Sequence, residues 1–142
     1  MDNKDILNKI EELKTNYLLE INSWTTIGDL ANKSGTIITT EKKVYSYTIF
    51  FKSEIKLPIN VNSFIEEYPP LTDYQYNQLL NFIKEENLLD KTFEEENIKD
   101  AGFTIAIKQN EKERIINNCI SLDEKNPKIY EKLLIFIKNN LL

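Results

Sequence analysis

The segment that most constrains the fold runs from residue 100 to residue 117, where an alternating run is followed by a short polar stretch and a second β-branched run. Phe103, Ile105 and Ile107 alternate with smaller or polar residues, so their side chains share one face of an extended chain. The polar residues 109–112 separate them from the run at 113–116. This pattern predicts a β-hairpin with one apolar face, which the rest of the chain must cover.

Three other segments have the spacing of amphipathic helices. Residues 5–21 repeat apolar side chains at helical intervals, which predicts an N-terminal helix. Thr72 and Gln75 fit a capping box, which predicts a central helix over residues 72–86. Asn126 followed by Pro127 is a favoured helix start, so a C-terminal helix is expected to close the sheet.

Residues 23–61 are rich in β-favouring side chains and predict an antiparallel meander. Its expected strands cover residues 35–40, 44–51 and 55–61, and Pro58 places the last of these at an edge that can pair with a second copy or a partner. Residues 32–35 are expected to form a turn, and residues 64–68 a short helical turn that ends at Pro69 and Pro70.

The fold class expected from these elements is α+β. The sequence predicts one domain over residues 1–142, with an antiparallel sheet of about five to six strands, a meander plus the hairpin, packed by N-terminal, central and C-terminal helices.

The residue types in the chain weigh against most catalytic chemistries. The sequence has no histidine and only one cysteine, Cys119, which removes the usual general base, the common nucleophilic triads and a Cys/His zinc site. Asp29, Asp100 and Glu113 remain as oxygen donors, but no segment has the spacing of a metal-binding loop. We therefore expect a protein without catalytic residues, metal or cofactor.

The negative charge of the chain is concentrated in one segment. The formal net charge is -5, and residues 84–100 hold seven acidic residues and three lysines, which gives -4 from that segment alone. Nucleic acid is a poor ligand for such a surface, because phosphate binding needs basic side chains. A basic protein is a better partner, while the other interpretation is a solvated loop whose charges serve solubility.

Aromatic residues near the ends of predicted elements are the other candidates for contact, because aromatic side chains often anchor interfaces. They include Trp24, Tyr68, Tyr74 and Tyr76, of which Tyr74 lies off the apolar stripe of its helix. The expected partner-binding residues are Tyr74, Glu85, Glu86, Asp90, Glu94, Glu95, Glu96 and Asp100.

No apolar run in the sequence approaches the ~18 residues that span a bilayer, and the N-terminal residues alternate acid and base rather than forming a signal peptide. The expected location is therefore the cytoplasm, with no membrane contact.

The order of elements resembles the immunity proteins of bacterial polymorphic and contact-dependent toxin systems. The likeness lies in the N-terminal helix, the Thr/Tyr-rich meander of residues 35–51, the helix of residues 72–86, the segment Asp-Ala-Gly-Phe-Thr-Ile at 100–105 and the closing helix. It implies a non-enzymatic cytoplasmic binder that occludes the active site of a cognate, basic toxin domain. Two alternatives stay open: a phage-encoded inhibitor of a host defence protein, and a carboxylate- or metal-dependent small-ligand binder or enzyme.

Overall fold

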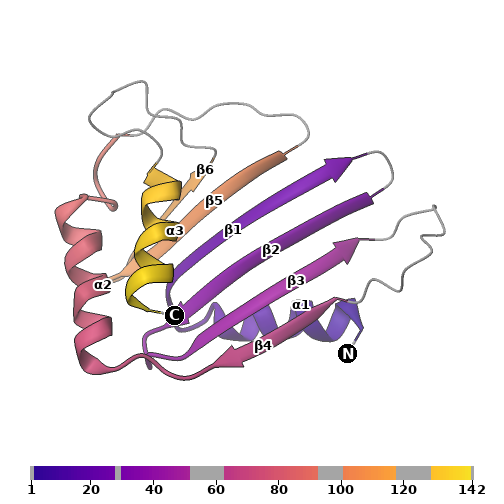
Figure 1. The fold of residues 1–142 in the computed structure, drawn as a ribbon, viewed down its shortest axis with the longest axis horizontal. Coiled ribbons are helices and arrows are strands. Elements are labelled where there is room, and N and C mark those ends of the chain that lie inside the picture. Colours follow the sequence, from indigo (N-terminus) through magenta and orange to yellow (C-terminus); the bar gives the residue numbers. More distant parts are fainter. Residues whose placement is uncertain (1, 28–29, 52–62, 93–100, 118–128, 142) are drawn as a thin grey trace.

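The computed structural model describes residues 2–27, 30–51, 63–92, 101–117 and 129–141. Its elements follow the chain in this order: α1 (Asn3–Leu13), β1 (Tyr17–Ile27), β2 (Leu30–Thr39), β3 (Val44–Phe51), β4 (Phe64–Tyr68), α2 (Asp73–Glu85), β5 (Ala101–Gln109), β6 (Lys112–Asn117) and α3 (Ile129–Asn140). The six strands form one antiparallel sheet in the order β4-β3-β2-β1-β5-β6 (Figure 1). The predicted α+β class is confirmed.

The predicted hairpin of residues 100–117 is present as β5 and β6. Gln109 pairs with Lys112, so the turn contracts to Asn110 and Glu111, and both have positive φ (54° and 65°), as a type I′ turn requires. The alternation along β5 also holds, because Ile105 and Ile107 are buried under α2 and α3, whereas the alternating faces of a strand send Ala106 to the side of α1.

The expectation of one helix over residues 5–21 is wrong. Helix α1 ends at Leu13, a turn follows in which the Thr15 hydroxyl donates to the carbonyl of Glu12 (2.7 Å), and Tyr17 begins β1. The pairing register of β1 shifts between Tyr17 and Leu19, which places the neighbouring Leu18 and Leu19 in the same apolar cluster. This irregularity breaks the alternation of a strand and imitates helical spacing, while both neighbouring strands supply backbone hydrogen bonds.

Two further expectations in the meander are corrected. Residues 32–35 lie inside β2 rather than in a turn, and Gly35 is needed because the hydroxyl of Tyr47 would be 2.5 Å from a β-carbon at this position. Residues 64–68 form strand β4 instead of a helical turn, because their backbone pairs with β3, from Val44–Tyr68 to Thr48–Phe64. The strand ends before Pro69 and Pro70, which cannot donate to a ladder.

The central helix is confirmed together with its capping box. The Gln75 amide donates to the Thr72 hydroxyl (3.1 Å), and the Thr72 amide donates to the Gln75 side-chain carbonyl (2.9 Å). The predicted strand 55–61 and the Asn126–Pro127 cap lie outside the described residues, as do Asp29, Cys119 and residues 93–100.

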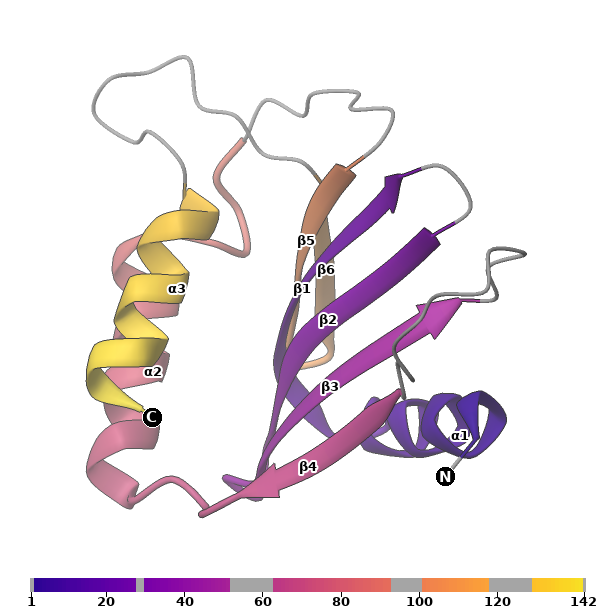
Figure 2. The same cartoon turned by 45° about the vertical axis from the view of Figure 1, so that its right-hand side comes forward.

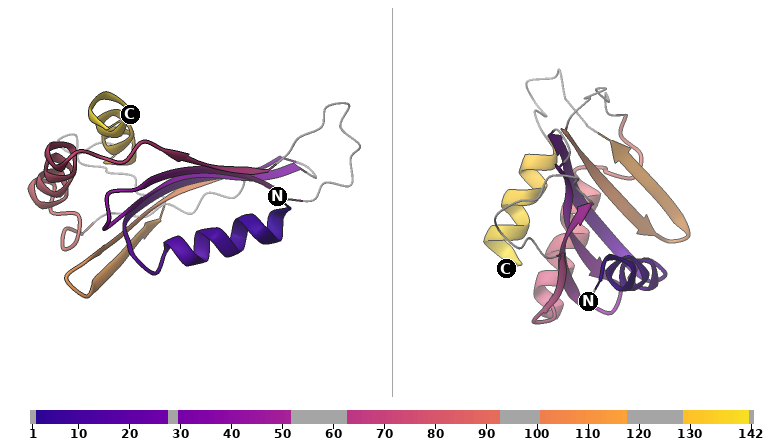
Figure 3. Two further views of the ribbon diagram at one scale, coloured as in Figure 1. Left: turned by 90° about the horizontal axis from the view of Figure 1, so that it is seen from below. Right: turned by 90° about the vertical axis from the view of Figure 1, so that its right-hand side faces the viewer.

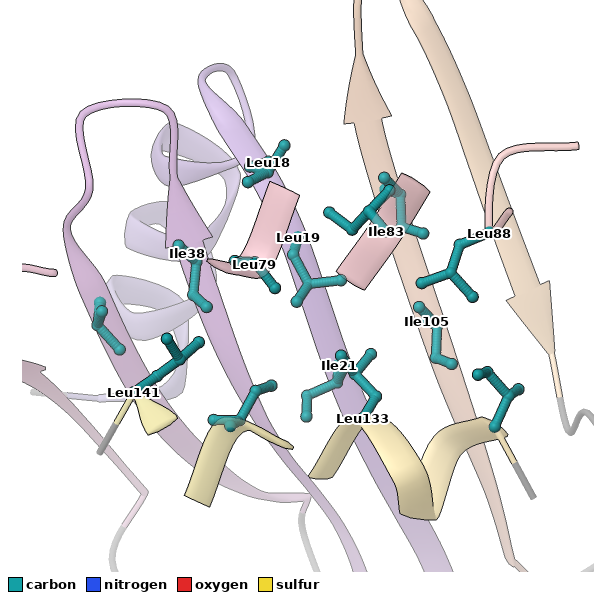
Figure 4. Packing of buried hydrophobic residues seen from close by; sticks show 14 of the residues in the cluster. Leu18, Leu19, Ile21, Ile38, Leu79, Ile83, Leu88, Ile105, Leu133 and Leu141 are labelled. Atoms are coloured by element: carbon teal, nitrogen blue, oxygen red, sulfur yellow. The ribbon is translucent and has the colours of Figure 1, made fainter. Parts of the chain in front are cut away.

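The sheet is covered differently on its two faces (Figures 2 and 3). On one face α1 packs over the smaller apolar cluster, which includes Ile6, Ile10, Tyr45 and Ile49. On the other face α2 and α3 stand side by side over a larger cluster, with the rings of Phe82 and Phe136 4.7 Å apart. Leu79 and Ile83 from α2 and Leu133 from α3 meet residues of the central strands in this cluster, including Leu19, Ile21 and Ile105 (Figure 4).

The face under α2 and α3 changes character across the sheet. Near the helices the cross-strand row Leu19–Ile38–Val44 is buried and apolar. Two rows further along the strands, Ser23 pairs with Ser34 and Ser34 with Thr48, and the last two hydroxyls are 2.9 Å apart. The helix pair therefore covers one end of this face, and the end that leads to Phe64 of β4 carries hydroxyl groups.

Candidate protein-binding surface

Two of the predicted acidic contact residues are used inside the fold. The Glu86 carboxylate pairs with Lys132 of α3 and its side chain is only 15% exposed. The Asp90 carboxylate pairs with Lys112 at the start of β6. These two acids therefore compensate lysines that lie 46 and 22 residues away in sequence, rather than presenting free charge to a partner.

The turn between these acids is fixed from both sides. Asn87 adopts φ 51°, its amide donates to the carbonyl of Lys84 (3.1 Å), and the amide of Leu88 donates to the carbonyl of Ile83 (3.1 Å). This is a Schellman motif, in which Leu88 packs back on the helix and is fully buried. The guanidinium of Arg114 donates to the carbonyl of Leu88 (2.9 Å), which ties the turn to β6.

The other four predicted acids, Glu94, Glu95, Glu96 and Asp100, lie outside the described residues. Their role in contact stays a prediction. Of the acidic set, Glu85 alone is both described and exposed without a recorded ion pair to another described residue.

Tyr74 and Glu85 share the outer side of α2. Tyr74 is 71% exposed, and its hydroxyl accepts a hydrogen bond from the side-chain amide of Gln78 (3.1 Å). Gln78, Asn81 and Glu85 follow Tyr74 at intervals of four, three and four residues, which keeps all four on one stripe of the helix. Leu79 and Ile83 lie on the opposite, buried side. Eleven residues separate Tyr74 from Glu85, which corresponds to about 16 Å along the helix axis.

The start of α2 is held by the tip of the β2–β3 hairpin. The ammonium group of Lys42 pairs with Asp73 and lies 5.8 Å from the centre of the Tyr76 ring, and the amide of Leu71 donates to the carbonyl of Lys42 (2.8 Å). The hydrogen bond from Lys42, together with its charge, lowers the pKa of the Asp73 carboxyl. These contacts position Tyr74 on a rigid part of the molecule.

The sequence analysis missed the exposed strand β4. Phe64 is 42% exposed and Tyr68 is 38% exposed, while Glu66 and Glu67 between them are exposed and make no ion pair or hydrogen bond with another described residue. The signal that points to a strand is the alternation of Phe64, Glu66 and Tyr68 with Ile65 and Glu67, followed by two prolines.

Strand β4 and the start of α2 together form one exposed run. Nine of the eleven residues from 64 to 74 are exposed, and the exceptions are the half-buried Ile65 and the buried Leu71. Three of the exposed side chains are aromatic, Phe64, Tyr68 and Tyr74. We call residues 64–74 the β4–α2 segment. Large exposed aromatic side chains in one short segment are typical of an interaction surface.

A buried polar network beneath α1 is satisfied within the protein. Glu20 is 2% exposed, and its carboxylate accepts a hydrogen bond from the Tyr47 hydroxyl (2.7 Å) and pairs with the ammonium group of Lys14 (2.9 Å). Tyr17 donates its hydroxyl to Glu113 (2.7 Å), and burial together with that carboxylate raises the pKa of Tyr17 well above its ordinary value. These contacts join α1, β1 and β6.

The metal site considered from sequence is not tested as a whole, since only Glu113 of its three candidate ligands is described. Within the described ranges, no group of three or more His, Cys, Asp or Glu side chains is placed to hold a metal ion. Among the helices of the described residues, none is long and apolar enough to cross a membrane. No family model matches the chain, and no curated protein matches it.

Proposed function

We propose that this chain is a non-enzymatic, cytoplasmic immunity protein that binds a cognate bacterial toxin and occludes its active site. The observation that carries the proposal is the β4–α2 segment, in which Phe64, Tyr68 and Tyr74 are exposed beside acidic side chains. Aromatic side chains that become buried on association often contribute most of the binding energy of an interface.

Charge supports a basic partner. The protein has a net charge of -5, and the acids of β4 add their charge to the outer stripe of α2, which ends at Glu85. A toxin domain that cuts nucleic acid needs a basic cleft for phosphates, so an acidic surface both attracts it and competes for that cleft.

The test begins with capture of the partner from the native cell by the tagged protein, at low and at high salt. We expect one basic protein that is bound at low salt and lost at high salt, and whose toxic activity disappears when the two proteins are mixed. Capture of a host defence protein instead would support the phage-inhibitor alternative. If no protein is captured at either salt, the proposal is wrong.

Two matched variants then locate the surface. Tyr74→Ala removes an exposed aromatic side chain from the β4–α2 segment and should weaken capture at least tenfold. Ile135→Ala removes a side chain from α3 that is also largely exposed, at 59%, and should leave capture unchanged. Equal binding by the two variants would show that the partner docks elsewhere.

A further inference from the structure

We infer that β4 is a docking strand, whose outer edge accepts an extended segment with two adjacent basic residues and so adds a strand to the sheet. The inference rests on the proposed function for the existence of a protein partner. It deepens that proposal by naming the backbone and side-chain chemistry that β4 recognises.

The position of β4 supplies the backbone groups. Among the strands of the described residues, β4 is at one end of the sheet, and β3 is its neighbour on one side (Figure 2). An edge strand presents N–H and C=O groups along its outer side, and an extended peptide can pair with them by strand addition.

The pairing register places the side chains of β4 on two defined faces. Phe64, Glu66 and Tyr68 pair with Thr48, Ser46 and Val44, so they lie on the face that α2 and α3 partly cover. Consecutive members of this aromatic–acid–aromatic row are about 6.6 Å apart along the strand. A cation that pairs with Glu66 therefore lies between two aromatic rings, which favours a lysine or arginine side chain over a neutral one.

Glu67 extends the same preference to the other face. It pairs with Tyr45, beside Ile65, which packs against the smaller cluster under α1. Because neighbouring residues of a strand point to opposite faces, Glu66 and Glu67 present one carboxylate on each face of the sheet. An added strand with two adjacent basic residues places one cation opposite each carboxylate, whereas apolar residues before and after them face Phe64 and Tyr68.

The opposite edge of the sheet lacks these properties. On β6, Lys112 pairs with Asp90, Arg114 donates to the carbonyl of Leu88, and Glu113 accepts from Tyr17. The three charged side chains of β6 are thus engaged by the protein itself. By contrast, Glu66 and Glu67 have no ion pair among the residues for which the structure gives contacts.

The direct probe is a capped, fluorescent octapeptide with a central Lys–Arg pair and flanking valine and threonine residues, titrated against the full chain and followed by anisotropy. We expect saturable binding that weakens with salt, and at least tenfold weaker binding when the central pair is replaced by Glu–Glu. If the two peptides bind equally, or neither binds, the inference is wrong.

A second peptide tests the backbone pairing. N-methylation of both central residues keeps the two positive charges but removes one N–H group from each edge of the peptide, since neighbouring amides point to opposite edges. Strand addition predicts at least tenfold weaker binding. Unchanged binding would reduce the contact to electrostatic attraction and overturn the inference.

Charge-matched protein variants locate the site. Glu66→Lys combined with Glu67→Lys should weaken peptide binding at least tenfold. Glu11→Lys combined with Glu111→Lys changes the net charge equally at exposed positions of α1 and of the β5–β6 turn, and should have less than a twofold effect. Equal losses in both double variants would exclude β4 as the site.

The two proposals fail in distinguishable ways. A partner that is captured normally by the Glu66/Glu67 variant, but not by Tyr74→Ala, would leave the proposed function standing and overturn the docking strand. Specific binding of the Lys–Arg peptide without any captured partner would do the reverse.

Discussion

The two edges of the sheet treat their charges in opposite ways. At the β6 edge, Lys112, Glu113 and Arg114 are each engaged by another part of the chain. At the β4 edge, Glu66 and Glu67 remain exposed between two aromatic side chains. One edge therefore stabilises the fold through its charged groups, and the other keeps charge available for a partner.

Helix α2 repeats this contrast along its own length. Its C-terminal end is joined to α3 by Glu86 and Lys132, and the turn that follows it is joined to β6 by Asp90 and Lys112. Its N-terminal end exposes Tyr74, close in sequence to β4. The comparison teaches that an acidic segment in a sequence becomes a contact surface only where the fold supplies no lysine to pair with it.

The largest expected effect separates the two edges by stability. Leu88→Ala removes a fully buried side chain next to the β6 edge and should lower the free energy of unfolding by about 2–5 kcal/mol. Tyr68→Ala, at the β4 edge, removes a side chain that is 38% exposed and should cost about 1 kcal/mol or less. Urea denaturation measures both values, and similar losses at the two edges would contradict the comparison.

A smaller effect is expected for the charged groups themselves. Arg114→Ala removes a charged donor from the buried end of the α2 turn and should cost about 1.5–3 kcal/mol. Glu66→Ala should change the free energy of unfolding by no more than about 0.5 kcal/mol. The prediction fails if Glu66→Ala proves the more destabilising substitution in thermal and urea denaturation.

The smallest effect at neutral pH concerns the link between β1 and β6. Tyr17→Phe removes the hydrogen bond to Glu113 and should cost about 0.5–1.5 kcal/mol at pH 7. Because the pKa of Tyr17 is raised in the folded protein, the unfolded chain loses this proton first. The stabilisation is therefore complete below the ordinary pKa of about 10 and is lost as the pH rises above it.

The measurement for this prediction is the slope of unfolding free energy against pH between about 9.5 and 11. Burial also raises the pKa of Tyr76, so Tyr17→Phe should reduce the negative slope without removing it. An identical slope in the wild-type protein and the variant would contradict the assigned role of Tyr17.

Local signals explain the parts of the fold that the sequence predicts correctly. The β5–β6 hairpin follows from alternation and a short polar turn, and the start of α2 follows from Thr72 and Gln75, which lie three residues apart. Strands β1 and β4 were missed because their evidence is not local. The irregular pairing at Leu18 hides the alternation of β1, and β4 is defined by its pairing with β3.

The candidate surface divides in the same way. The exposure of Tyr74 follows from its place off the apolar stripe of α2, which a helical periodicity shows. The pairing of Glu86 with Lys132 and of Asp90 with Lys112 depends on contacts between distant segments, so composition alone overstated the free charge at this end of α2. For the same reason Glu66 and Glu67 carried no special signal in the sequence.

The most direct test of the central claim is amide hydrogen exchange of the protein alone and in complex with its captured partner. We predict slower exchange in the complex at Phe64–Tyr68 and in the first turn of α2, with little change at Lys112–Asn117. Slower exchange confined to β6 or to α1, with β4 unchanged, would contradict the account.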